Sequence, residues 1–109
     1  MANSIKGETT LGDYTLAFNF GTFCQLEDKT RLKVPDLLQA MQVGLGFNEL
    51  KDFVWAGLRQ HHPEMTDEDV IALLNEQGFA EGSAAVARGV SSFFGEPKAK
   101  DKNPTKSSQ

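Results

Sequence analysis

Cysteine, positive charge and long apolar runs are all scarce in this chain of 109 residues. The single cysteine, Cys24, excludes an internal disulfide and cannot make a cysteine-based zinc site by itself. No apolar run approaches the roughly 20 residues that a membrane-spanning helix needs. Lysines and arginines number 11 against 15 aspartates and glutamates, and this net charge of -4 argues against general nucleic-acid binding. We therefore expect no membrane and no nucleic acid among the partners.

The remaining composition is that of one globular domain with a short polar extension. Hydrophobic residues make up 39% and charged residues 24%, with eight phenylalanines, one tyrosine and one tryptophan to build a core. Residues 1–94 hold seven lysines and arginines against thirteen acids, a net charge of -6. Residues 95–109 hold four lysines against two acids, with two prolines and no large apolar residue. We predict a single folded domain over 1–94 and a disordered basic tail over 95–109.

The first twenty residues show the alternation of a β-hairpin. Tyr14, Leu16, Phe18 and Phe20 recur at a period of two, and Gly12-Asp13 supplies a turn before them. This pattern predicts a hairpin over about residues 3–20, with these four side chains on one apolar face. On the preceding strand, positions 5, 7 and 9 are expected to face inward.

After residue 20 the apolar period changes to that of α-helices, and the chain carries clear start and stop signals. Pro35 suits the first turn of a helix, Thr66 can cap one, and Gly78 can end one. The predicted fold class is α+β, with an N-terminal β-hairpin followed by four or five short α-helices over about 21–94. The helices are expected near residues 21–29, 34–45, 48–61, 66–77 and 80–94.

Each predicted helix has a stripe assigned to the core. In the first helix the stripe contains Phe20, Phe23, Cys24 and Glu27. The later stripes include Ile71 beside Val70, Leu73 and Leu74 in the fourth helix, and Phe79 in line with Val86 and Val90 in the last. Gly82 and Gly89 border the last stripe, so a neighbouring backbone is expected to approach closely there.

No set of residues forms a catalytic or metal-binding constellation. His61 and His62 are the one local pair of metal-ligand type, but adjacent side chains on a helix point about 100° apart and cannot chelate one ion together. We expect a solvated helix end there instead. Cys24 falls on an apolar helix face, which favours a buried, inert thiol over a nucleophile. The prediction is a protein that is not an enzyme and has no cofactor and no metal.

Three aromatic residues are not explained by the core stripes. Trp55 lies to one side of its helix's stripe, either because that helix is buried on two sides or because the indole is partly exposed. Phe93 and Phe94 are adjacent at the end of the folded region, where they either pack on the hairpin or dock against a partner or a second copy. These alternatives stay open, and an acidic body with apolar anchors favours a binding module.

The order of these features resembles the tail assembly chaperones of tailed phages, in the branch named after gene transfer agents. The resemblance covers roughly residues 5–94 and depends on Leu26-Glu27, on Trp55-Ala56-Gly57-Leu58 and on the helix cap at Thr66. It implies a non-enzymatic protein that binds the tape-measure protein, keeps it soluble and leaves as tail tube subunits polymerise around it. Because Met1 to Lys6 show no signal segment, we expect the chain in the cytoplasm of the bacterial host.

Under this interpretation, Trp55, Leu58, Phe93 and Phe94 are the candidate partner-binding residues, because the apolar helix faces of a tape measure need apolar contacts. The acidic body would keep the complex soluble and complement basic stretches of the client. The tail tube protein as a second partner, and a homo-oligomer, stay open. The main alternative is a structural minor tail or connector protein that is retained in the virion.

Overall fold

An antiparallel hairpin begins the part of the chain that the computed structural model describes, residues 6–95. Strand β1 (Glu8–Leu11) pairs with β2 (Tyr14–Ala17), with Leu11 opposite Tyr14 and Glu8 opposite Ala17. The predicted turn is confirmed: Gly12 has a φ of 61°, which glycine adopts without the steric penalty of a side chain. The predicted inward position 5 lies outside the described residues.

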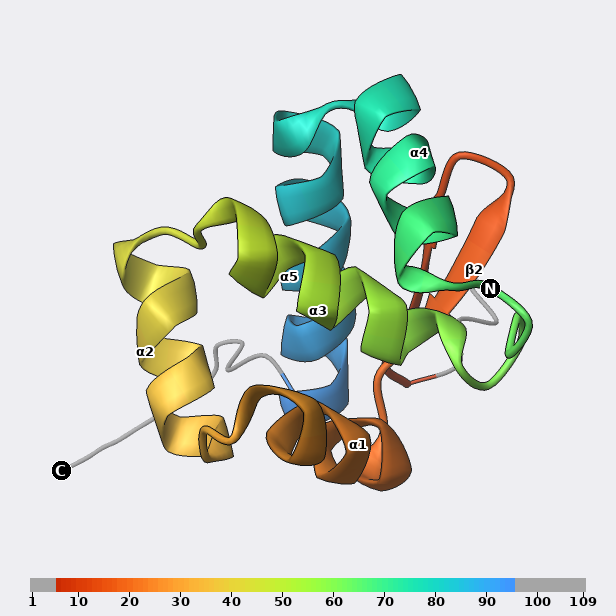
Figure 1. Ribbon diagram of the computed structural model, residues 1–109. Helices are drawn as coiled ribbons and strands as arrows, with labels where there is room; N and C mark the ends of the chain where they lie inside the picture. Colours follow the sequence, from red (N-terminus) through yellow and green to blue (C-terminus); the bar gives the residue numbers. More distant parts are fainter. Residues whose placement is uncertain (1–5, 96–109) are drawn as a thin grey trace, which may run out of the picture.

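Five helices follow the hairpin, so the predicted α+β fold is confirmed (Figure 1). Their boundaries agree with the local signals: Pro35 lies in the first turn of α2, and Gly78 ends α4. At Thr66 the side-chain oxygen accepts from the Asp69 amide, and the Asp69 carboxylate accepts from the Thr66 amide. The helices are α1 (Phe20–Thr30), α2 (Val34–Val43), α3 (Phe47–Leu58), α4 (Asp67–Gln77) and α5 (Phe79–Phe94).

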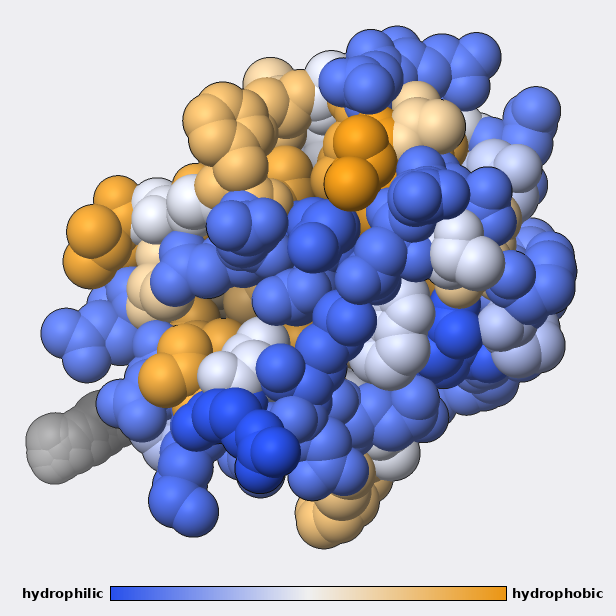
Figure 2. Space-filling view, viewed as in Figure 1, coloured by the Kyte–Doolittle hydropathy of each residue, from blue (hydrophilic) through white to orange (hydrophobic). Residues whose placement is uncertain are grey.

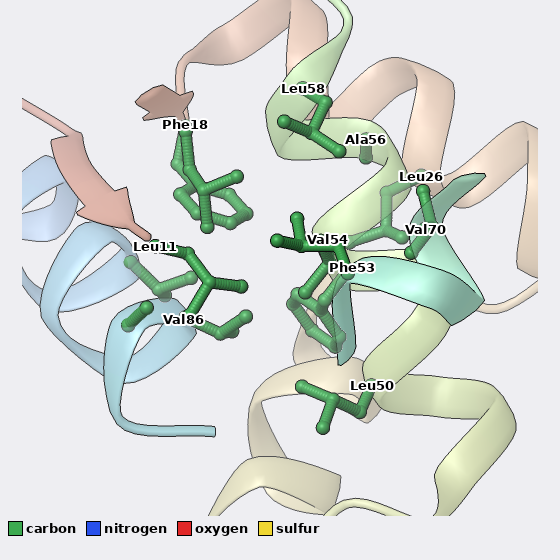
Figure 3. Close-up of a cluster of buried hydrophobic side chains, with 14 of the residues drawn as sticks. Leu11, Phe18, Leu26, Leu50, Phe53, Val54, Ala56, Leu58, Val70 and Val86 are labelled. Carbon is green, nitrogen blue, oxygen red and sulfur yellow. The ribbon is translucent and has the colours of Figure 1, made fainter. Parts of the chain in front are cut away.

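Helix α3 lies at the centre of the fold, in contact with α1, α4, α5 and strand β2 (Figure 1). Its buried side includes Leu50, Phe53, Val54 and Leu58, each at most 1% exposed (Figure 3). The helix ends at Leu58 rather than at the expected residue 61, because the chain turns before Pro63. None of the helices within residues 6–95 is long and apolar enough to cross a membrane.

Phe18, which follows the hairpin, packs its ring against a glycine of α5 and a glycine of α3. Its ring is fully buried, and a Cβ on Gly89 of α5 would lie 2.5 Å from Phe18 Cδ2. A Cβ on Gly57 of α3 would lie 3.0 Å from Phe18 Cζ. A close approach does occur at Gly89, and also at Gly82, where a Cβ would lie 2.6 Å from Leu74 Cδ2. At both glycines the neighbour is a side chain and not the expected backbone.

Gly7 fastens the start of the hairpin to the end of α5. Its φ is 86°, its amide donates to Ser92 Oγ at 2.9 Å, and its carbonyl accepts from the Phe18 amide at 2.8 Å. A Cβ there would lie 2.0 Å from the Phe18 carbonyl oxygen, so only glycine fits. This junction sets the position of the last turn of α5, which carries Phe93 and Phe94.

The first helix differs most from the sequence prediction. The Asn19 side chain accepts from the Thr22 amide and caps the start of α1, so strand β2 ends at Ala17. Phe20 therefore leaves the strand alternation and is 79% exposed. The buried side of α1 is formed by Thr22, Phe23 and Leu26. Cys24 is exposed, so the expected buried thiol is wrong. The predicted tail beyond Gly95, residues 96–109, lies outside the described residues.

Candidate partner-binding surface

A hollow with aromatic walls lies where α1, the start of α2 and the end of α5 meet. Its volume is about 340 Å³, and its lining is almost wholly apolar. We call it the aromatic groove. It is lined by Phe20, Phe23, Cys24 and Glu27 from α1, Val34 from α2, and Phe93 and Phe94 from α5.

Three phenylalanine rings in mutual contact form the floor and one wall of the aromatic groove. The centroid of the Phe23 ring lies 5.4 Å from those of both Phe93 and Phe94, and these two rings lie 5.2 Å apart in an edge-to-face arrangement. Such pairs are stabilised beyond the area that they bury. Phe23 is 7% exposed, whereas Phe94 is 51% exposed. The groove therefore has a fixed aromatic base and an accessible aromatic edge.

Phe94 also lines a second hollow, of about 360 Å³, between α2 and α5. Leu38 and Met41 of α2 and Val90 of α5 supply its apolar lining. Helix α2 buries only Leu37 completely, so much of its apolar stripe faces these hollows rather than a closed core. Phe94 is thus shared by two adjoining hollows at the C-terminal end of α5.

The one carboxylate in the lining of the groove is already occupied. Glu27 Oε2 accepts from the backbone amide of Val34 at 2.7 Å, which holds the start of α2 against α1. Lys6 Nζ lies 5.6 Å from the centroid of the Phe93 ring, on the hairpin side of the groove. The lining holds no pair of acid and base groups, and its chemistry is that of apolar contact.

The four candidate residues predicted from the sequence do not form one site. Phe93 and Phe94 line the aromatic groove, where they pack on Phe23. Leu58 is fully buried, so its assignment as a partner-binding residue is wrong: it follows the core stripe of α3 (Figure 3). Trp55 is half-buried and lines neither hollow beside Phe94.

The indole of Trp55 is packed by charged groups of the protein itself. Lys29 Nζ lies 4.4 Å and the guanidinium carbon of Arg59 4.6 Å from the ring. Arg59 is held in turn by the backbone carbonyls of Trp55, Pro63 and Met65, to which it donates. These contacts explain the position of Trp55 beside the core stripe without a partner.

A cluster of charges adjoins this indole. Lys29 Nζ lies 3.2 Å and Lys51 Nζ 3.9 Å from the carboxylate of Asp67. Burial raises the pKa of the Asp52 carboxyl above its ordinary 3.8; Lys51 and Lys29 oppose this shift, and Asp67 adds to it. The cluster joins α1, α3 and α4, and Asp67 is paired with two lysines rather than set beside a nucleophile.

The two histidines bind the hairpin. His61 Nε2 lies 2.9 Å from Glu8 Oε2, and His62 Nε2 accepts from the Thr15 amide at 3.1 Å. The solvated helix end expected at this point is confirmed only for His61, which is exposed; α3 has already ended at Leu58, and His62 is half-buried against the hairpin. Within residues 6–95 no group of three or more potential ligands that could hold a metal ion is found.

Another apolar patch is exposed where α3 and α5 begin, beside α4 (Figure 2). Phe47 is 80% exposed, and its ring meets that of Phe79 with centroids 5.0 Å apart. Ile71 and Phe79 were expected in core stripes, but they are 47% and 42% exposed because Val70, Leu73 and Val86 already fill the core on those sides. The patch lies apart from the aromatic groove, with which it shares no lining residue.

Phe20, Phe23, Cys24 and Glu27 form one helical stripe, which the sequence analysis placed in the core, and all four line the aromatic groove. The placement of Phe23 is confirmed, since it is 7% exposed. For Phe20 and Cys24, which are exposed, the assignment to the interior was wrong. Comparisons with protein-family models, with curated proteins and with solved structures found no match.

Proposed function

We propose that this protein is a non-enzymatic tail assembly chaperone, which binds and solubilises the tape-measure protein during the morphogenesis of a phage or phage-like tail. The observation that carries the proposal is the aromatic groove, with Phe20 at 79% and Phe94 at 51% exposure on the surface of a small acidic domain. The order of segments that resembles such chaperones supports the same function.

The groove suits a helical client. A tape measure exposes long apolar helix faces before the tube covers it, and such faces aggregate unless apolar groups are laid against them. A helix placed in an apolar groove presents anchors at successive turns. The aromatic groove and the hollow between α2 and α5 adjoin at Phe94, so together they offer neighbouring apolar contacts around the C-terminal end of α5. The net charge of -6 over residues 1–94 favours solubility of the complex.

The test is co-expression with the tape-measure protein encoded beside this chain, followed by size-exclusion chromatography with light scattering. We expect a soluble complex with the native chain and none with the Phe20→Ala/Phe94→Ala variant. Phe47→Ala is the matched control, because Phe47 and Phe20 are 80% and 79% exposed and only Phe20 lies in the groove. Circular dichroism of each variant shows whether the fold is retained.

The single cysteine provides a second readout on the same complex. Cys24 is exposed and lines the groove, so a bound client should slow its alkylation by N-ethylmaleimide. An insoluble tape measure with nothing co-eluting contradicts the proposal. If mass spectrometry then finds this protein in purified particles, the structural minor tail or connector alternative takes its place, since a chaperone leaves before the particle is complete.

A further inference from the structure

The second apolar patch, where α3 and α5 begin, combines an exposed aromatic ring with a hollow beside it. Phe47 is 80% exposed, and its ring borders a hollow of about 460 Å³ whose lining comes from α3, α4 and the start of α5. Ile71 and Phe79, both exposed, line the same hollow. A Cβ at Gly78, another lining residue, would meet nothing within 4 Å, so space is open above the backbone there. We call this lining the α3–α5 patch.

The polar groups of the α3–α5 patch suit an identical surface. Asn48 and Asn75 are exposed, and a carboxamide both donates and accepts, so it can pair with an identical group across a two-fold axis. Among the described residues that line the hollow, none is acidic. The one charged side chain of the lining, Lys51, already lies 3.9 Å from the carboxylate of Asp67. Two copies of this acidic chain can therefore meet here without bringing carboxylates into the contact.

Acidic side chains lie around this lining rather than in it. Glu68 is exposed and precedes Ile71 by three residues on α4, so it lies on the same side of that helix. Glu49 is nearer still in the sequence to Phe47, and its Oε1 accepts from the Gly46 amide at 2.8 Å. With a net charge of -4 on each chain, these acids oppose the approach of a second copy at low salt. Screening in salt should therefore strengthen such a contact.

The exposed apolar area of the patch is of the size that a weak dimer needs. At about 200 Å² for a large apolar side chain, the exposed fractions of Phe47 (80%), Phe79 (42%) and Ile71 (47%) amount to roughly 300 Å². Since about 65% of a homodimer interface is apolar, such a patch buries roughly 500 Å² on each copy. The total of roughly 1,000 Å² lies at the lower limit of specific interfaces and far below that of obligate dimers.

From these features we infer that the α3–α5 patch binds a second copy of this chain in a reversible dimer with two-fold symmetry. The Phe47 ring of each copy enters the hollow of the other, between Ile71 and Phe79. A two-fold contact uses the same surface of both copies, so that surface must carry both the inserted group and the space that receives it. The inference does not depend on the proposed function, because the patch shares no lining residue with the aromatic groove.

Sedimentation equilibrium of the full-length protein tests the inference. Between about 5 µM and about 1 mM, we expect the average mass to rise from 12.0 kDa towards twice that value, with half of the chains paired near about 100 µM. At about 0.5 M salt the dissociation constant should fall about threefold, because the repulsion between the two acidic chains is screened.

Two pairs of variants locate the interface. Phe47→Ala should weaken the dimer at least tenfold, whereas Phe20→Ala should leave it unchanged, because Phe20 is as exposed, at 79% against 80%, but lies in the aromatic groove. Asn75→Asp adds a carboxylate to the patch on each copy and should also weaken the dimer at least tenfold. Gln25→Glu makes the same change of charge at an exposed position of α1 and should have little effect. Circular dichroism shows whether each variant keeps the fold.

A mass that stays at 12.0 kDa at about 1 mM overturns the inference. Equal effects of Phe47→Ala and Phe20→Ala also overturn it, since the copies would then meet through another surface. A mass that continues to rise beyond the dimer does so as well, because a two-fold contact closes at two copies. The tape-measure experiment is separate: if no complex forms with the native chain, the proposed function fails and the dimer, measured on the protein alone, is unaffected.

Discussion

Replacement of Gly89 by alanine sets helix propensity against packing at one position in α5. In an open helix interior this change stabilises the folded state by about 1 kcal/mol. At Gly89 the new Cβ would lie 2.5 Å from Cδ2 and 2.9 Å from Cε2 of Phe18, and 3.2 Å from the Thr9 methyl. Phe18 is fully buried in a close-packed core, where a shift of its ring disturbs the neighbouring side chains.

The cost of the packing clash should exceed the gain in helix propensity, and the size of the net effect follows from these two contributions. Extra methyl groups in a well-packed core cost about 1–3 kcal/mol, and two ring carbons in contact place this site near 3. With the gain in propensity subtracted, we expect Gly89→Ala to lower the free energy of unfolding by about 2 kcal/mol. For a domain of this size that corresponds to a fall of about 8–16 °C in melting temperature.

Urea unfolding measures this change, with the fluorescence of the single tryptophan, Trp55, as the signal. The control is Gly21→Ala in α1, where a new Cβ would lie 3.4 Å from Asn19 Oδ1 and no loss of stability is expected. Adding Phe18→Leu to Gly89→Ala should recover about 1 kcal/mol relative to the sum of the single changes, because the smaller side chain relieves the clash. A Gly89→Ala protein as stable as the native one would refute the packing of Phe18 described above.

Three further changes test other parts of the structure. Thr66→Ala removes the acceptor of the Asp69 amide at 3.1 Å and should cost about 1 kcal/mol in urea unfolding. Asp52→Asn should raise the urea midpoint at pH 7: burial raises the folded-state pKa of this carboxyl above 3.8, so ionised Asp52 destabilises the fold above that pKa, and the gain should shrink as the pH falls through it. An unchanged gain at pH 4 contradicts this cause. His62→Ala removes the acceptor of the Thr15 amide and should cost about 1–2 kcal/mol, with faster hydrogen exchange at that amide but not in α4.

Local signals were sufficient to predict the hairpin and the helices. The Gly12-Asp13 turn, the Thr66 cap and the stop at Gly78 each depend on interactions within about four residues, so the sequence shows them directly. The close approach at Gly89 could also be anticipated, because a glycine beside an apolar stripe leaves room for a neighbour. The sequence did not show that this neighbour would be Phe18.

The candidate site was predicted only in part, because exposure is decided by neighbours. In α1 two apolar faces overlap at Phe23, and the sequence does not show that α3 covers the face of Leu26 and leaves Phe20 in solvent. In α3 the periodicity alone places Leu58 in the core, and its assignment to the binding surface was an error that came from the resemblance. The position of Trp55 beside the core stripe is explained by Lys29 of α1, which lies over the indole ring; the sequence of α3 alone does not show this contact.

The sequence by itself determined the order and type of the elements, and those ends that depend on a capping side chain, a proline or a glycine close by in the chain, such as Thr66 and Gly78. The tertiary structure alone decided that Phe20 and Phe94, from the first and the last helix, would border the same groove. It also decided that Lys6 would lie over the ring of Phe93 in its lining. The physical reason is that burial and local charge depend on which distant segment covers each helix face, and that choice is made by the packing of the whole core around α3.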